Sequence, residues 1–161
     1  MISYQNYVNL MEKLIIMNTR SSKELRRYNY LAGELDAAYH EINVKLKMSD
    51  SAMTILYAIC DQGEACLLRD IYGQFGVSKQ TINSALRKLE EEKLVFLEAV
   101  DAKNKRVCLT TKGKETANRT AKRIIEVEND IFSSWEEEEV EKYLELTERY
   151  LRDFRERSSK L

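Results

Sequence analysis

The sequence predicts a mainly α-helical protein with one small β-hairpin: a winged helix-turn-helix flanked by long N- and C-terminal dimerisation helices. The 161 residues include no proline and only five glycines, a composition that favours long helices over a loop-rich or all-β fold. Apolar side chains recur at helical spacing along most of the chain. Only 94–100 and 105–110 are rich in β-branched and aromatic residues, and the polar bend 101–104 separates them, as in a hairpin.

The N-terminal part of the chain predicts three helices. The first carries its apolar stripe between Tyr4 and Ile15, and polar residues 19–22 interrupt it. The second carries Leu25, Tyr28, Leu31, Leu35, Tyr39 and Ile42 on one stripe. Ser49 or Asp50 is then placed to cap a short, very apolar helix that ends at Gln62-Gly63.

The rest of the chain predicts a helix-turn-helix, the hairpin and two more helices. CLLRDIYGQF is expected to form a two-turn helix closed by Gly76, followed by a helix from Ser78 to about Glu91. A helix capped by Thr110 or Thr111 is expected to run to about Phe132, and the last helix to start near Glu136. In the first of these two helices, Ile124, Val127 and Ile131 are expected to be buried. The predicted regions are 1–45 for N-terminal dimerisation, 46–112 for the winged helix-turn-helix, and 113–161 for C-terminal dimerisation.

Composition narrows the class of protein. The net charge of −1 argues against a general polyanion binder, so that contact with nucleic acid would depend on local charge. Without an 18-residue apolar run or a signal-peptide pattern, we expect a cytoplasmic protein with no membrane partner. Three cysteines without CxxC spacing and a single histidine predict no disulfide framework, no metal and no cofactor. No catalytic motif is found, so we expect no enzyme; oxidant sensing by Cys60 or Cys66 stays a minor alternative.

The helix at 78–91 separates its residues by chemistry. At about 100° per residue, one narrow face holds the apolar positions Ile82, Ala85, Leu86 and Leu89. The opposite face holds Gln80, Ser84, Arg87 and Glu91, with Asn83 and Lys88 on its flanks. From 78 to 89 there are three cations and no anion, whereas an ordinary solvated helix would alternate Glu and Lys. The residues of this face are therefore more typical of a DNA-binding surface than of an ordinary solvent-exposed one.

The side chains on this helix match the groups that DNA offers. Asn and Gln amides can pair with adenine edges and Arg with guanine, while Ser and Thr hydroxyls can form hydrogen bonds with phosphates or bases. We expect Gln80, Ser84 and Arg87 to face bases and Ser78, Lys79 and Lys88 to face phosphate. The basic hairpin tip would reach flanking phosphates or the minor groove. The predicted DNA-binding residues are Ser78, Lys79, Gln80, Thr81, Asn83, Ser84, Arg87, Lys88, Lys103, Asn104, Lys105 and Arg106.

Four motifs in order resemble the MarR family of bacterial winged-helix regulators over about residues 49–115. They are the helix start VSKQT (77–81), the spaced Leu86 and Leu89, Leu94-Val95 entering the wing, and LTTKG (109–113) after it. The chain departs from the family at the wing, where Ala102 and Lys103 replace two arginines, and after Leu94-Val95, where FLEAV lacks the usual arginine. Lys93 replaces a glycine, at a cost of about 1 kcal/mol if the position still needs a left-handed backbone.

The first and last helices carry apolar stripes that are too long for a winged domain to cover, so they predict a partner surface. We therefore expect a homodimer, formed through residues 1–45 and 115–157, that binds a pseudo-palindromic double-stranded DNA operator, most simply as a repressor. The family resemblance adds a small-molecule effector between the dimer helices and the winged region, for which Tyr28 and Tyr39 are candidate contacts. A winged-helix module that binds protein instead of DNA, or a purely structural helical dimer, remains an alternative.

Overall fold

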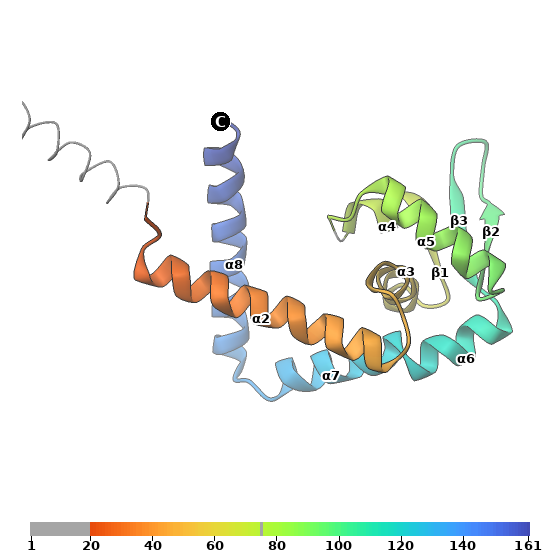
Figure 1. The fold of residues 1–161 in the computed structure, drawn as a ribbon, viewed down its shortest axis with the longest axis horizontal. Coiled ribbons are helices and arrows are strands. Elements are labelled where there is room, and N and C mark those ends of the chain that lie inside the picture. Colours follow the sequence, from red (N-terminus) through yellow and green to blue (C-terminus); the bar gives the residue numbers. More distant parts are fainter. Residues whose placement is uncertain (1–19, 75) are drawn as a thin grey trace, which may run out of the picture. The chain divides into compact units, whose positions relative to one another are not determined.

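The fold is taken from a computed structural model, which describes residues 20–74 and 76–161 (Figure 1). The chain divides into two compact units, Met1–Lys45 and Leu46–Leu161. The helix expected between Tyr4 and Ile15 lies outside the described residues. Among the described residues, the first unit provides one long helix, and the second provides a winged-helix region followed by three further helices.

The described part of the first unit is the helix α2, Lys23–Lys45. Ser22 caps it, because its hydroxyl oxygen accepts a hydrogen bond from the Leu25 amide at 3.0 Å. The apolar stripe predicted on this helix is present, but its side chains are largely exposed, and Leu31 and Leu35 each keep 54% of their surface. The second predicted helix is therefore confirmed, with an apolar face that α2 does not bury by itself.

The core of the second unit is organised around α3, Asp50–Asp61. Ser49 is its N-cap, with the Ala52 amide donating to the Ser49 hydroxyl oxygen at 3.3 Å. Ile55, Leu56 and Ile59 of α3 are completely buried. They pack against α5 (Lys79–Glu91) and α7 (Ala121–Ser133) among other neighbours. This apolar helix therefore provides the base on which the following helix-turn-helix is built.

A three-stranded antiparallel sheet forms the wing, one strand more than the predicted hairpin. Its strands are β1 (Ala65–Leu67), β2 (Val95–Ala99) and β3 (Lys105–Leu109), in the order β1-β3-β2. The hairpin is confirmed, but the helix expected to start at Cys66 is wrong at its beginning: α4 spans Leu68–Gln74. Cys66 pairs with Val107 in β3, and both side chains are buried. Strand pairing with a segment distant in the sequence therefore outweighs the local preference of these residues for a helix.

The single helix expected from 110 to 132 is broken in two. Thr110 caps α6 (Thr111–Arg119), and α7 begins after Thr120, whose φ of −127° and ψ of −95° are not helical. The Thr120 hydroxyl donates to the Thr116 carbonyl at 2.8 Å, a local bond that competes with the helical ladder. The expected burial is correct for Ile124 but wrong for Val127 and Ile131, which are 58% and 47% exposed.

The motif at 109–113 locks the wing to α6. The Gly113 amide donates to the Thr110 hydroxyl at 2.9 Å, and that hydroxyl donates to the Lys93 carbonyl at 2.6 Å. A Cβ at Gly113 would lie 1.9 Å from the Leu94 carbonyl oxygen, so only glycine fits there. Lys93 has a φ of +59°, which confirms that this position needs the left-handed conformation that the family supplies with glycine.

The last helix, α8, spans Glu137–Ser158 and has no buried residue. Its first turn is held by the Glu136 amide, which donates to the Glu139 carboxylate at 3.1 Å. At its base the ring centroids of Phe132 and Tyr143 each lie 5.5 Å from that of Trp135, in edge-to-face contacts. This aromatic cluster fixes the corner between α7 and α8.

Candidate nucleic-acid interface

The helix-turn-helix consists of α4 and α5. The turn between them contains Gly76 with a φ of +63°, a conformation that favours glycine. Ser78 is the N-cap of α5, since the Thr81 amide donates to its hydroxyl oxygen at 3.1 Å. The Thr81 hydroxyl lies 2.8 Å from the same oxygen, so the two hydroxyls are hydrogen-bonded to each other at the start of the helix.

The division of α5 into two faces is confirmed. Ile82, Ala85, Leu86 and Leu89 are all at least 95% buried against the core. The predicted DNA-facing side chains from Ser78 to Lys88 are all exposed. In the described part of the chain, Arg87 and Lys88 have no ion pair with an acidic side chain. The exposed face of α5 therefore carries uncompensated positive charge together with amide and hydroxyl groups.

Tyr72 of α4 contacts two of these α5 side chains. Its hydroxyl donates a hydrogen bond to Asn83 Oδ1 at 2.6 Å. The Lys79 ammonium lies 5.5 Å from the centroid of its ring, within the range of a cation–π interaction. Tyr72 is not predictable from the sequence as a residue of this site, because both contacts link separate helices. The periodicity of apolar residues within one helix does not indicate contacts between two helices.

The wing tip, between β2 and β3, is organised by Asp101. One carboxylate oxygen accepts from the backbone amides of Lys103 and Asn104, at 2.7 and 2.8 Å. The other accepts from the Asn104 side-chain amide at 2.7 Å. These hydrogen bonds, that from the Asn104 side chain first, lower the pKa of the Asp101 carboxyl. Asn104 is therefore engaged within the tip, and its amide nitrogen points to Asp101 instead of outward.

The basic residues of the wing differ in how far their charge is compensated. Arg106 in β3 is paired with Glu98 directly across in β2, with 3.3 Å between Nε and a carboxylate oxygen. Lys103 and Lys105 are exposed, and neither makes an ion pair in the described part of the chain. The charge of Arg69, at the start of α4, is the smallest of the causes that lower the pKa of Asp101, and its guanidinium lies 3.5 Å from the Asp70 carboxylate.

The three cysteines favour the protonated thiol. Burial raises the pKa of the Cys66 thiol to about 11, and the carboxylates of Asp70 and Asp61 add to the effect. The pKa values of Cys60 and Cys108 are also raised, in both cases mainly by burial. Because the thiolate is the form that reacts with oxidants, this environment disfavours the oxidant-sensing alternative.

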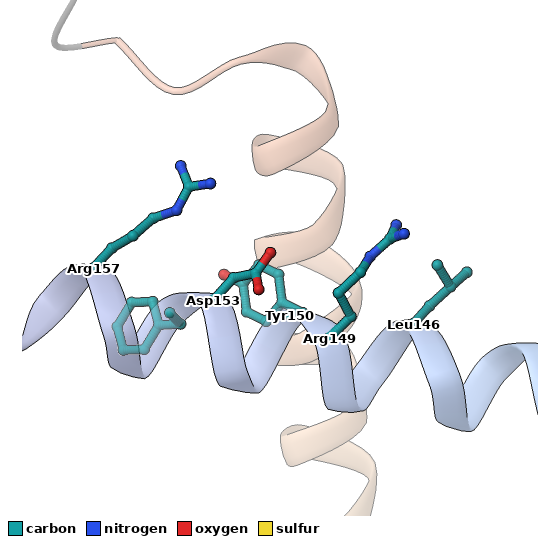
Figure 2. A pocket seen from close by; sticks show the side chains of 6 residues that line it. Leu146, Arg149, Tyr150, Asp153 and Arg157 are labelled. Atoms are coloured by element: carbon teal, nitrogen blue, oxygen red, sulfur yellow. The ribbon is translucent and has the colours of Figure 1, made fainter.

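The other candidate sites lie on the long helices. Tyr28 and Tyr39 are on α2 and are 48% and 40% exposed. Figure 2 shows an open depression along α8, in which arginines and aromatic rings project from the same helix; it is lined by Leu146, Arg149, Tyr150, Asp153, Phe154 and Arg157. The described residues contain no group of three or more His, Cys, Asp or Glu side chains suited to a metal ion. Within the same part of the chain, no helix is long and apolar enough to cross a membrane.

Comparison with known structures identifies the architecture. The crystal structure of an S. aureus MepR–DNA complex matches with a TM-score of 0.61 and 20% identity, covering 84% of this chain and 99% of that one. A MarR protein from Peptoclostridium difficile matches with a TM-score of 0.61 and 23% identity, over 84% and 90% of the two chains. The PcaV transcriptional regulator from Streptomyces coelicolor, in complex with its natural ligand, matches with a TM-score of 0.59 and 16% identity, over 83% and 98%.

Identities below 25% show a shared fold, and the sequence comparisons add a match to one family model. No curated protein sequence gives a significant match to the chain. The MarR family model matches residues 46–106, which include α3, the helix-turn-helix and the hairpin up to Arg106. The chain has the winged-helix fold seen in MarR-family regulators, and its region 46–106 matches the model of the MarR family.

Proposed function

We propose that the protein is a transcriptional regulator that binds double-stranded DNA sequence-specifically through α5 and the wing. The observation that carries this proposal is the exposed face of α5, where three cations and no acid lie between 78 and 89. A helix start with available backbone amides, and exposed lysines on the neighbouring wing, add to the same positive surface. The proposal needs no cofactor or catalytic residue, and it places the protein in the cytoplasm with the DNA.

The residues of the interface take different roles in this proposal. Gln80, Ser84 and Arg87 lie on the outermost part of α5 and would contact base edges in the major groove. Ser78, Lys79 and Lys88 would contact phosphates on either side. At the wing, Lys103 and Lys105 would contact flanking phosphates, while Arg106 contributes less because Glu98 already binds it.

We further propose that the protein acts as a homodimer through residues 1–45 and 115–157. Apolar side chains remain exposed along α2, including Leu31 and Leu35, and along α8, including Leu144 and Leu151 at 47% and 46%. Stripes of this kind on monomers mark surfaces for a partner. A two-fold dimer would present two α5 helices about one DNA turn apart to a pseudo-palindromic operator, most simply as a repressor.

A small-molecule effector is a further part of the proposal. The PcaV structure of the same fold contains its natural ligand, and here Tyr28 and Tyr39 provide exposed aromatic surface on α2. An organic ligand that contacts these rings in the dimer would favour one arrangement of the two α5 helices over another. Operator affinity would then depend on ligand concentration through differential binding to the two arrangements.

A salt series on a selected operator tests the proposed DNA binding. A duplex is first selected from a random pool, and its affinity is then measured by fluorescence anisotropy at increasing salt. We expect the logarithm of the association constant to fall steeply with the logarithm of the salt concentration. In Arg87→Ala, affinity for this duplex should fall by about tenfold or more, because a base contact is lost.

Arg123 provides the matched control for Arg87. It lies on α7, outside the proposed DNA-contacting residues but within the segment proposed for dimerisation, so the variant is first checked to be a dimer; its guanidinium binds Glu126 at 3.0 Å. Arg123→Ala removes the same charge and should leave operator affinity within about twofold. Weak binding of every duplex, with little dependence on salt, would contradict DNA recognition and favour a winged-helix module that binds protein.

A further inference from the structure

Tyr72 links two residues of α5 that lie one helical turn apart. Lys79 and Asn83 are four positions apart and so share one side of the helix. The ring of Tyr72 lies beneath the Lys79 ammonium, and its hydroxyl donates to Asn83 Oδ1 at 2.6 Å. Tyr72 is itself half-buried and packs against the core from α4. A side chain anchored in the core thus holds two exposed groups of the α5 surface.

The hydrogen bond to Asn83 decides which part of its amide is available. A primary amide has an oxygen that accepts and a nitrogen that donates two hydrogen bonds. Because Oδ1 accepts from the Tyr72 hydroxyl, the amide oxygen faces α4. Asn83 is exposed and its side-chain nitrogen donates to no described residue, so that nitrogen remains available to a partner. Adenine is read by an amide that accepts from its N6 and donates to its N7 at the same time, which this orientation opposes.

We propose that Tyr72 is a positioning residue that makes Asn83 a donor to base edges, with guanine preferred over adenine. Guanine offers two neighbouring acceptors, N7 and O6, in the major groove, whereas adenine offers an acceptor next to a donor. This inference rests on the proposed DNA binding. It assigns Asn83 a different base from the adenine that amide chemistry alone predicts, and it gives Tyr72 a role in specificity without direct contact to a base.

Base preference in operator selections tests this role. With the unchanged protein, one position in each half-site should prefer guanine over adenine by about tenfold. Tyr72→Phe keeps the ring beneath Lys79 but removes the hydroxyl, so the Asn83 amide can turn. The preference at that position should then fall to about twofold or less, while the preferences at other positions remain.

Two substitutions at Asn83 connect the preference to its amide. Asn83→Asp keeps an oxygen for the Tyr72 hydroxyl but has no donor, so the guanine preference should disappear. Asn83→Ala should also abolish it, and adding Tyr72→Phe to Asn83→Ala should change nothing further. Because Asn83 is exposed, these variants remain informative even if Tyr72→Phe lowers stability.

Tyr57→Phe is the matched control. It removes a hydroxyl that donates to a Glu128 carboxylate oxygen at 2.5 Å, between α3 and α7, and should leave every base preference unchanged. An equal guanine preference in Tyr72→Phe and in the unchanged protein, or a preference that survives in Asn83→Ala, would overturn the inference alone. Failure of the unchanged protein to select any duplex would overturn the proposed function and the inference with it.

Discussion

At Gly113 the backbone of α6 lies close to the backbone of Leu94, just before the wing strand β2. The missing side chain of the glycine leaves room for the Leu94 carbonyl oxygen, which also accepts a hydrogen bond from the Thr110 amide at 3.0 Å. A methyl group in this space could be accommodated only by moving backbone, because the nearest atoms belong to the peptide unit of Leu94. The close approach therefore explains why the family motif ends in glycine.

Gly113→Ala should destabilise the winged-helix region. We expect the free energy of unfolding to fall by about 2 kcal/mol or more, the cost of forcing atoms into a packed site. Urea denaturation followed by circular dichroism measures it. Gly73→Ala is the control, because a Cβ at this helical position has nothing within 4 Å and should be neutral or slightly stabilising. Equal stability of Gly113→Ala and the unchanged protein would contradict this packing.

At the residue scale, the sequence predicts burial within one element better than contacts between elements. The four buried positions of α5 follow from helical periodicity alone, and the positive φ of Lys93 follows from the family pattern. The bond from Tyr72 to Asn83 does not, since the two residues are eleven positions apart and on different helices. Similarly, the ion pair that compensates Arg106 depends on strand register, which places Glu98 opposite.

At the element scale, the wing tip depends on one ionised carboxylate. The depressed pKa of Asp101 means that its hydrogen bonds stabilise the tip above the ordinary Asp pKa and are lost as pH falls through the folded value. Chemical shifts of the Lys103 and Asn104 amides should therefore titrate with a midpoint below the ordinary value of about 3.9. NMR spectra recorded from neutral to acidic pH measure this midpoint.

The same titration has a simple control. Asp101→Asn replaces the carboxylate with an amide that does not ionise, so the titration of the Lys103 and Asn104 amides should disappear. A midpoint at or above the ordinary Asp value would show that the carboxylate is not bound as the structure places it. At neutral pH the tip of the unchanged protein should stay ordered.

The elements themselves were predictable to different degrees. The helices α2, α3 and α5 and the hairpin follow from periodicity and caps. The strand β1 was missed because it has three residues and its partner β3 lies about forty positions further on. The break at Thr120 was missed because no glycine or proline marks it, and only backbone geometry and a local hydroxyl bond reveal it.

At the scale of the whole molecule, the exposed apolar stripes predict a dimer. Leu151 lies on the stripe of α8, and a carboxylate there would have to be buried without a counterion in an apolar interface. Sedimentation equilibrium should show a dimer for the unchanged protein and mainly monomer for Leu151→Glu. The exposed Glu148 is off the stripe, and Glu148→Gln should leave the dimer intact. A monomeric unchanged protein would contradict the proposed assembly.

The exposure of Val127 and Ile131 on α7 also concerns the assembly of the whole molecule. Their spacing predicts an apolar face, and the spacing is right, but a sequence does not say whether such a face is buried by the same chain or by another. In this chain the α3 contact covers α7 at Ile124 and leaves these two side chains exposed. A partner surface, as proposed for α8, would account for both.

Protection of the selected operator from chemical cleavage shows whether two α5 helices bind the DNA together. The proposed dimer predicts two protected major-groove segments whose centres lie about ten base pairs apart, or a multiple of this distance, with additional protection at the flanks from the wings. Both segments should lose protection together in Arg87→Ala. A single protected segment, protection without this spacing, or none at all would contradict the claim.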